Sequence, residues 1–286
     1  MNEESLVPTR GKTAFVLSGG GAKGAFQVGV LKQLTEKGIV PSSIFGSSVG
    51  ALNATGMAYA NVKRLEDVWL AIERNSDIIK FQVGTVFFST LGLYSIEPLH
   101  KLIKKFVGSY IPNAIRPVAC VNQIYTGEIV YMNPYTCHAY GLTFDEAVLA
   151  SAAIPLAMEP VNKIWVDGGV RETVPLRVAI EEGFDTIYVV LSNPYQRNPE
   201  PGEDIKNWLC MGARAIELLT HEIFINDIKT CLKCNHDPDK RSIDIHVYAP
   251  DAQVSGTLEF DPKKIRQGID MGYKAKEISR ETIQRV

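Results

Sequence analysis

Residues 44–53 read Ile44-Phe45-Gly46-Ser47-Ser48-Val49-Gly50-Ala51-Leu52-Asn53, a short apolar run that passes through a Gly-x-Ser-x-Gly pentapeptide into a helix-like segment. This order predicts a tight strand-to-helix turn with Ser48 exposed at its apex as a candidate nucleophile. Gly46 and Gly50 fit the same geometry, because a side chain at either position would clash where backbone meets backbone. The alternative is a plain turn in which Ser48 only caps the helix.

A second glycine cluster lies upstream, between an apolar run at 13–18 and a helical pattern that begins at Ala25 and stops at Gly38. The cluster reads Gly19-Gly20-Gly21-Ala22-Lys23-Gly24. Backbone N–H groups at a helix N-terminus are unpaired and lie at the positive end of the helix dipole, which suits an anion. In an acyl-transfer enzyme that anion would be the transient oxyanion of a tetrahedral intermediate.

The same cluster also matches Gly-x-Gly-x-x-Gly, the fingerprint of dinucleotide binding. That function would require an acidic residue at the end of the second strand, about 20 residues further on, to hold a ribose. The second apolar run ends in Phe45-Gly46-Ser47-Ser48, with no carboxylate at its tip. Dinucleotide binding and a plain packing turn therefore remain as weaker alternatives to an oxyanion site.

The third element is an apolar run that delivers Asp167 directly into the glycine pair Gly168 and Gly169. An aspartate at the carboxyl end of a strand lies where open α/β sheets place their chemistry. Taken alone, the pattern also fits an Asx turn, in which the carboxylate only accepts hydrogen bonds from the following backbone N–H groups.

Together, the three segments resemble the patatin-like phospholipase family, whose pattern is a Gly-Gly-Gly-x-[Lys/Arg]-Gly loop, then Gly-x-Ser-x-Gly, then Asp-Gly-[Gly/Ala]. The segment Ala150-Ser151-Ala152-Ala153-Ile154-Pro155 looks like a further motif of the family, and the resemblance covers residues 12–192. It implies a three-layer α/β/α fold with a mostly parallel central sheet. It also implies a Ser48–Asp167 catalytic dyad, an oxyanion hole in the glycine loop and hydrolysis of lipid acyl esters. Lys23 stands where many members carry arginine, which keeps the charge but not the bidentate geometry.

An aspartate is an unusual base for a serine hydroxyl, because its ordinary pKa is about 3.9. Burial in a dry pocket disfavours the charged carboxylate and raises that pKa toward the operating pH, where a general base works best. The dyad hypothesis therefore requires a desolvated site around Asp167. We expect an acyl-chain pocket to supply it.

A Ser-His-Asp triad is the rival mechanism, and three histidines follow Asp167 in the order that an α/β-hydrolase would need: His221, His236 and His246. His246 lies in an alternating pattern typical of a strand face. The other two histidines read as a helix start at His100 and a polar loop at His138. None has a glycine-rich context, so the dyad is favoured.

The composition indicates one globular enzyme domain. The chain has 286 residues, of which 45% are hydrophobic and 22% charged, and a net charge of −2, which argues against a nucleic-acid partner. We expect a tail at 1–11 and a single catalytic domain at 12–286, with a motif core at 12–192 and a C-terminal extension at 203–286. The oligomeric state stays open.

The chain has no apolar run of transmembrane length, and residues 1–5 are polar and acidic rather than typical of a secretory leader. We therefore expect a cytoplasmic protein that contacts membranes peripherally. No cofactor or metal is expected. The one metal-like cluster is Cys231, Cys234 and His236; zinc there would lack a fourth ligand unless His246 or an aspartate supplied it, and free thiols are the alternative.

Strands and helices alternate along the chain in the βαβ rhythm. Beyond the motifs, we expect helices at 62–72, 97–106, 175–184 and 204–229 and from 262, an antiparallel strand pair at 116–125 and 128–132, and strands at 186–192 and 243–249. Residues 81–94 are rich in aromatic side chains and could form a lid facing lipid or pack into the core. Two other functions stay open on this fold: an acyltransferase with the same dyad, and a non-catalytic lipid-binding or regulatory protein.

Overall fold

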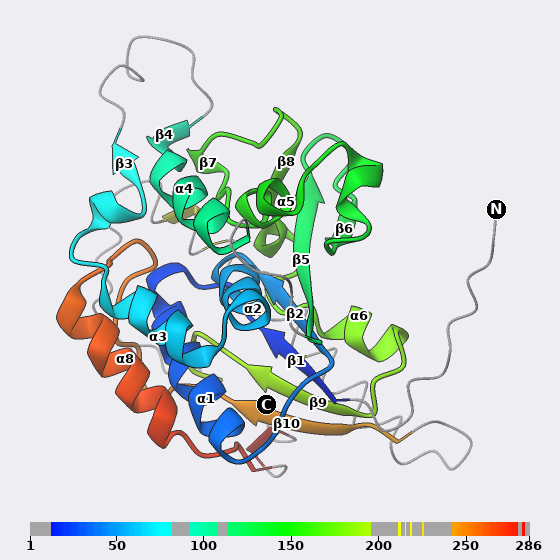
Figure 1. Ribbon diagram of the computed structural model, residues 1–286, viewed down its shortest axis with the longest axis vertical. Helices are drawn as coiled ribbons and strands as arrows, with labels where there is room; N and C mark the ends of the chain where they lie inside the picture. Colours follow the sequence, from blue (N-terminus) through cyan, green and yellow to red (C-terminus); the bar gives the residue numbers. More distant parts are fainter. Residues whose placement is uncertain are drawn as a thin grey trace.

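The computed structural model describes residues 13–81, 92–107, 114–195 and 242–279, with isolated positions between 211 and 225 and at 282–283. Within these ranges seven strands form a central sheet in the order β10-β9-β1-β2-β5-β6, and β8 pairs with β5 (Figure 1). The strands from β10 to β5 all run parallel, whereas β6 and β8 run antiparallel to β5. Their bounds are Thr13–Leu17 (β1), Ser43–Ser47 (β2), Arg116–Gln123 (β5), Ile129–Met132 (β6), Trp165–Asp167 (β8), Thr186–Val190 (β9) and Asp244–Tyr248 (β10).

The sheet is buried on both faces, as the continuous apolar run of β1 requires. Phe15 and Leu17 join a core cluster on one face, and Ala14 and Val16 join a second cluster on the other. The first face is covered by α1 (Ala25–Glu36), α2 (Val49–Tyr59), α3 (Val62–Leu70) and α8 (Pro262–Lys274), and the second by α6 (Leu176–Glu181). The three-layer α/β/α fold is therefore confirmed.

Local signals set the ends of several helices. Gly38, with φ of 76°, follows the end of α1. Pro262 opens α8, and the Asp261 carboxylate accepts hydrogen bonds from the Lys263 and Lys264 N–H groups, which caps this helix. The helices predicted at 62–72, 97–106 and 175–184 are observed as α3, α4 (Glu97–Val107) and α6.

The upper part of the molecule in Figure 1 contains elements that were not among the predicted ones. They are α5 (Phe144–Ser151) and a three-stranded sheet of β3 (Lys80–Phe81), β4 (Gly92–Ser95) and β7 (Leu156–Met158).

Most of the aromatic segment at 81–94 lies outside the described residues. At its edges, the exposed Phe81 ring packs against Tyr94 with a centroid distance of 5.7 Å. The predicted helix at 204–229, apart from isolated positions, and Cys231, Cys234 and His236 also lie outside them.

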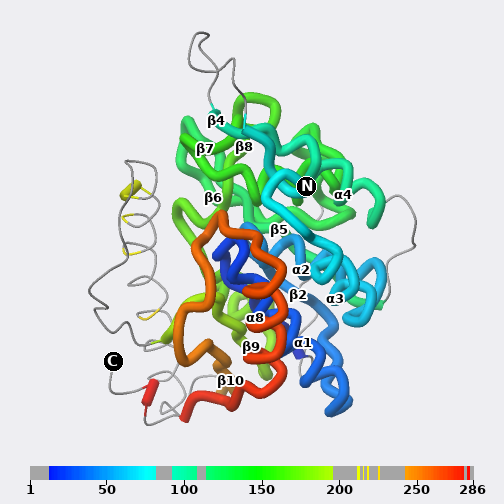
Figure 2. Tube along the Cα trace, turned by 90° about the vertical axis from the view of Figure 1, so that its left-hand side faces the viewer, coloured from blue at the N-terminus to red at the C-terminus, as the bar shows by residue number. Residues whose placement is uncertain are grey.

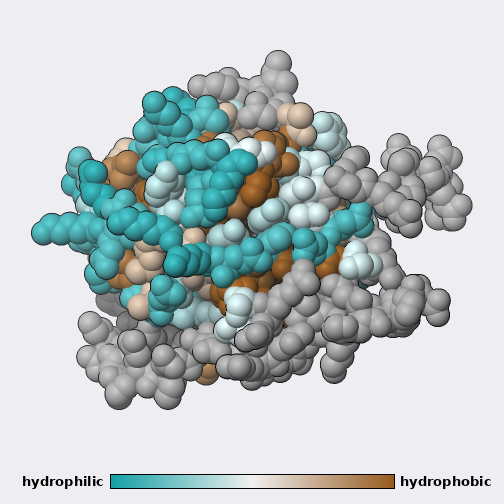
Figure 3. Space-filling view, turned by 90° about the horizontal axis from the view of Figure 1, so that it is seen from below, coloured by the Kyte–Doolittle hydropathy of each residue, from teal (hydrophilic) through white to brown (hydrophobic). Residues whose placement is uncertain are grey.

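The tube in Figure 2 shows α8 against α1 beside the sheet. Gly272 lets the two helices approach closely, because a Cβ there would lie 2.0 Å from the Phe26 backbone oxygen. Hydrophilic side chains cover much of the described surface on the face seen in Figure 3, with apolar side chains between them.

In the part of the chain that the structure describes, every helix is too short or too polar to span a bilayer. The division into tail, motif core and extension stays a prediction.

Candidate active site

Ser48 occupies a strained turn between β2 and α2. The prediction that Ser48 is exposed at the apex is wrong, because the residue is buried, with 7% of its surface exposed. Its φ of 54° and ψ of −126° lie in a sparsely populated region for a residue with a Cβ, at a cost of about 1–3 kcal/mol. The turn requires glycine on both sides. A Cβ at Gly46 would lie 2.2 Å from the Gly50 carbonyl carbon, and one at Gly50 would lie 2.3 Å from the Leu17 oxygen. The backbone thus has the form expected of a nucleophile elbow.

The Ser48 side chain does not cap α2, since it makes no capping hydrogen bond with the first turn of that helix. Its backbone N–H donates to Ser151 Oγ at 3.0 Å, and the Ser151 hydroxyl donates to the Cys120 oxygen at 2.6 Å. Ser151 is fully buried at the end of α5. Although it lies in a recognisable sequence motif, only the structure shows that it ties the elbow to β5.

The geometry of β5 brings Ser48 and Asp167 together. Val121 and Asn122 on β5 pair with β6 and also with β8, so β8 must lie on the opposite side of β5, which is the side of β2. There β2 ends at Ser47, opposite Cys120, and β8 ends at Asp167, opposite Val121. The two strands run toward each other along one edge of β5, and their carboxyl ends meet.

Asp167 is buried, with 5% of its surface exposed. Burial raises its pKa to about 7, while its interaction with the Ser48 side chain and a hydrogen bond from the Gly169 N–H lower the pKa in part. The Gly169 hydrogen bond, 2.7 Å long, is the predicted Asx turn. Asp167 therefore forms the Asx turn and also has the raised pKa that a general base requires.

The desolvation of Asp167 comes from a different source than we expected. Its backbone N–H donates to the Ala153 oxygen at 3.0 Å, and the adjacent Gly168 packs so closely on β5 that a Cβ would lie 2.4 Å from the Cys120 oxygen. Among the described residues, Asp167 does not line the apolar cavity beside Ser48. The protein interior, rather than an acyl-chain pocket, keeps this carboxyl group dry.

The glycine loop passes directly beside Ser48, since a Cβ on Gly19 would lie 3.3 Å from the Ser48 Cβ. Three of its N–H groups donate to backbone oxygens: Gly19 to Thr173 at 2.9 Å, Ala22 to Thr257 at 2.8 Å and Lys23 to Gly20 at 3.3 Å. Within the described residues, the N–H groups of Gly20 and Gly21 have no hydrogen-bond partner. These two remain available to a ligand.

The end of the loop forms the short helix η1 (Gly21–Gly24). Lys23 is buried there, and its Nζ donates to Asn193 Oδ1 at 2.6 Å, beyond the end of β9.

A dinucleotide pyrophosphate would need several loop N–H groups at once. Thr257 already accepts from Ala22 and packs against Gly21, where a Cβ would lie 2.0 Å from the Thr257 oxygen. This arrangement disfavours dinucleotide binding.

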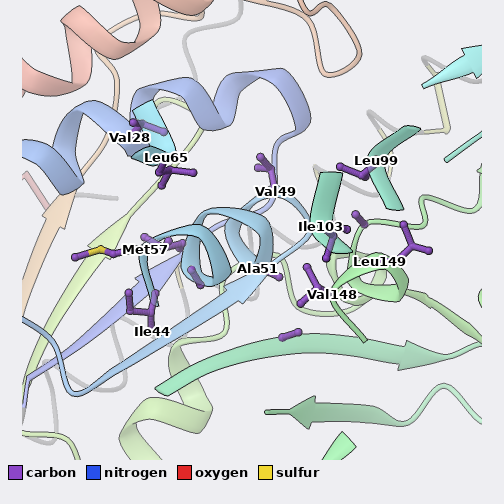
Figure 4. Close-up of a cluster of buried hydrophobic side chains, with 14 of the residues drawn as sticks. Val28, Ile44, Val49, Ala51, Met57, Leu65, Leu99, Ile103, Val148 and Leu149 are labelled. Carbon is purple, nitrogen blue, oxygen red and sulfur yellow. The ribbon is translucent and has the colours of Figure 1, made fainter. Parts of the chain in front are cut away.

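An apolar cavity with an empty volume of about 840 Å³ opens beside the elbow, and Ser48 and Gly21 form part of its wall. Val49, Leu99, Ile103 and Val148 gather around it from α2, α4 and α5 (Figure 4). The rest of the wall is mostly aliphatic and aromatic, and includes Leu52, Leu65, Val68, Trp69, Ile72, Ile78, Ile79, Leu102, Phe106, Ile154, Met158, Leu258 and Phe260.

None of the histidines that the structure describes lines the cavity beside Ser48. His246 lies on β10 at the far edge of the sheet, stacks on Tyr188 and pairs with Asp244 and Glu277. His100 pairs with Asp145, and His138 lies in the short helix η4 (Cys137–Tyr140). His221 and His236 fall outside the described residues. No group of three or more His, Cys, Asp or Glu side chains in the described ranges is arranged to hold a metal ion.

Comparison with known proteins identifies the family. The triacylglycerol lipase ptl3 of Schizosaccharomyces pombe is 33% identical over 113 residues, which are 36% of this chain and only 23% of that lipase. The uncharacterized protein YjjU of Escherichia coli is 24% identical over 92% of this chain and 75% of its own. The crystal structure of VipD from Legionella pneumophila aligns with a TM-score of 0.44 and 14% identity, over 94% of this chain and 68% of that chain. The family model described as patatin-like phospholipase matches residues 15–180, and the chain therefore belongs to the patatin-like phospholipase family.

Proposed function

We propose that this protein hydrolyses the carboxylic esters of lipids, of the phospholipase A or lysophospholipase type, through a Ser48–Asp167 dyad. Family membership and the lipase relatives support lipid acyl hydrolysis. The observation that carries the mechanism is the meeting of a strained serine and a carboxyl group with a pKa of about 7 beside an apolar cavity.

The acyl chain would occupy the cavity and bring its ester carbonyl to Ser48. Asp167 would take the Ser48 proton while Oγ forms a bond to the carbonyl carbon, and the Gly20 and Gly21 N–H groups would stabilise the oxyanion. Collapse of this intermediate breaks the ester C–O bond, and Asp167 returns the proton to the leaving alkoxide. The products of this half-reaction are an acyl-enzyme and a free alcohol.

Water would then repeat the sequence in the opposite sense. Asp167 accepts a proton from the water as its oxygen attacks the acyl carbonyl, and the proton passes to Ser48 Oγ as the fatty acid leaves. An alcohol or thiol in place of water would give acyl transfer, and loss of both steps would leave a lipid-binding protein. The apolar cavity suits all three functions, but only the first two need the raised pKa of Asp167.

We expect the protein to release labelled fatty acid from phospholipid vesicles or triacylglycerol emulsions in buffer that contains EDTA. The mechanism assigns the oxyanion to backbone N–H groups and the proton transfer to Asp167, so chelation should not reduce turnover. Mass spectrometry in the presence of a labelled alcohol acceptor would distinguish hydrolysis from transfer. Activity that disappears in EDTA and returns with calcium would show that a metal ion does the work assigned to the glycine loop.

Ser151→Ala should impair both the elbow and the fold. The substitution leaves the Ser48 N–H and the Cys120 oxygen without their shared partner, which we expect to lower the free energy of unfolding by about 1–3 kcal/mol. We also expect the rate of fluorophosphonate labelling at Ser48 to fall by about tenfold, because the strained turn loses a constraint. Ser42→Ala is the matched control, since Ser42 precedes β2 and makes only a 3.3 Å side-chain contact with the Thr13 oxygen. Equal labelling rates for the two variants would contradict this role.

A further inference from the structure

Two buried side-chain amides lie behind the glycine loop, on the face of the sheet that α1 and α2 cover. Gln27 on α1 and Asn53 on α2 are both fully buried. They bond to each other, with Asn53 Nδ2 donating to Gln27 Oε1 at 2.9 Å. Burying two primary amides is costly unless their donors and acceptors are satisfied. Their presence here therefore requires a reason.

The two amides hold the loop at its two ends. Gln27 Nε2 donates to the oxygen of Ser18, the residue before Gly19, at 2.8 Å. Asn53 Nδ2 donates to the oxygen of Gly24, the last residue of the loop, at 3.0 Å. Because the two amides also bond to each other, the distance between the loop ends is fixed by one continuous chain of hydrogen bonds.

The same chain reaches the residue on which Gly20 rests. Gln27 Nε2 also donates to Ser192 Oγ at 3.0 Å, and the Ser192 N–H donates to Ser18 Oγ at 2.8 Å. Ser192 packs directly under Gly20, since a Cβ on Gly20 would lie 2.5 Å from the Ser192 Cβ. Gln27 therefore hydrogen-bonds both to Ser18, the residue that leads into the loop, and to Ser192, the residue against which Gly20 packs.

Trp69 sets the direction of the whole network. Its indole N–H donates to Asn53 Oδ1 at 2.8 Å, and an indole can only donate. The Asn53 oxygen must therefore face Trp69, which turns the Asn53 amide nitrogen toward Gly24 and Gln27. Gln27 is then obliged to accept with its oxygen and to donate toward Ser18 and Ser192.

We propose that Gln27 and Asn53 are positioning residues that hold the glycine loop with the Gly20 and Gly21 N–H groups directed at the reacting carbonyl. The proposal rests on the function proposed above. Among the described residues Gln27 does not line the cavity and acts only through the loop, whereas Asn53 also forms part of the cavity wall. A displacement of about 1 Å in such donors can reduce turnover by about 100-fold, which gives the network a measurable effect.

The test compares Gln27→Met with Gln33→Met. Gln33 lies on the same helix and donates in the same way to two backbone oxygens, those of Tyr273 and Ala275, but these lie at the end of α8. We expect Gln27→Met to reduce kcat about 10–100-fold with KM changed less than about threefold. Gln33→Met should stay within about twofold of the wild type.

A pair of inhibitors separates loop positioning from general damage. A long-chain trifluoromethyl ketone forms an oxyanion on reaction with Ser48, whereas the matching alcohol only fills the cavity. Gln27→Met should lose affinity for the ketone in proportion to kcat and keep its affinity for the alcohol. The pH at which activity rises should not move, because Asp167 is untouched.

Trp69→Phe provides a second route should Gln27→Met fail to fold. Because Trp69 also forms part of the cavity wall, a change in cavity shape should affect the ketone and the alcohol alike, and the ratio of their affinities is the quantity that tests the loop. The substitution removes one N–H donor and frees the Asn53 amide to turn over, and we expect the ratio of ketone to alcohol affinity to fall about fivefold, equivalent to one hydrogen bond. A folded Gln27→Met or Trp69→Phe with the wild-type ratio would overturn the proposal, as would equal losses in Gln27→Met and Gln33→Met. Ser48→Ala is assayed alongside. If it keeps turnover, the proposed function itself fails; if it is inactive while Gln27→Met is normal, only the positioning role fails.

Discussion

Replacement of Ser48 by alanine is expected to abolish both ester hydrolysis and labelling by a fluorophosphonate probe. Turnover should fall by about three to six orders of magnitude, the range seen when a serine nucleophile is removed. Only an activated serine reacts with the probe, so a single labelled peptide containing Ser48 should be found by mass spectrometry in the wild type. The thermal unfolding temperature should change little, because Ser48 makes its structural hydrogen bonds through the backbone.

Ser47→Ala is the matched control for this experiment. Ser47 is the neighbouring buried serine of the same pentapeptide, but among the described residues it is not part of the cavity wall. We expect the Ser47 variant to keep both labelling and turnover. Labelling that persists in Ser48→Ala and disappears in Ser47→Ala would reassign the nucleophile.

The elements around the elbow were predictable because their signals are local. The apolar run of β1, the glycine after α1 and the pentapeptide that joins β2 to α2 each determine structure within a few residues. The structure agrees with all three. The helix α5 begins with a comparable local signal. Thr143 and Glu146 form a capping box at its start, and this pattern can be read from the sequence.

Other features depend on contacts between distant segments and leave no local signal. The direction of β8 is one example: its three residues pair antiparallel with β5, more than 40 residues earlier in the chain, so the sequence could predict an aspartate at a strand end but not the head-on approach to β2. The sheet of β3, β4 and β7 is another, because its strands have two to four residues each. The amides of Gln27 and Asn53 look like ordinary polar positions on helices.

The source of the Asp167 desolvation shows the same limit. From chemistry we could predict that the base must be dry, but not which atoms would exclude water. The structure assigns this role to the backbone of β5 and the segment around Ala153. Burial by these protein atoms raises the pKa of Asp167.

Asp167→Asn is expected to lower turnover by about 10²–10⁴-fold, because it removes the base but keeps an oxygen that can accept from the Gly169 N–H. His246→Ala and His100→Ala should each retain most activity, since both side chains pair with acidic residues elsewhere. His221→Ala and His236→Ala complete the series. In a triad, one histidine variant would be as damaged as Ser48→Ala. A folded histidine variant that loses turnover and fluorophosphonate reactivity together would therefore refute the dyad.

Asp167→Asn should also raise the thermal stability of the protein at alkaline pH. An unfolded chain releases the Asp167 proton near pH 3.9, whereas the folded protein holds it until about pH 7. Between these values the folded state binds more protons, so this group makes the free energy of unfolding fall as the pH rises. Asp167→Asn lacks the titration, and its unfolding temperature relative to the wild type should increase from pH 5 to pH 8.

The activity of the wild type should rise with pH while its stability falls. Catalysis needs the charged carboxylate of Asp167, whereas burial of that charge destabilises the folded protein. Turnover should rise with pH along a limb centred near pH 7, and that limb should persist in all four histidine variants. A histidine base would also titrate near this pH, so the limb alone does not distinguish the two mechanisms. The unfolding temperatures do distinguish the two mechanisms. Those of the wild type and Asp167→Asn diverge between pH 5 and pH 8 only if the Asp167 carboxyl group itself ionises over that range. If the wild type and Asp167→Asn showed parallel unfolding temperatures from pH 5 to pH 8, Asp167 would already be ionised below pH 5 and could not be the base that sets the limb.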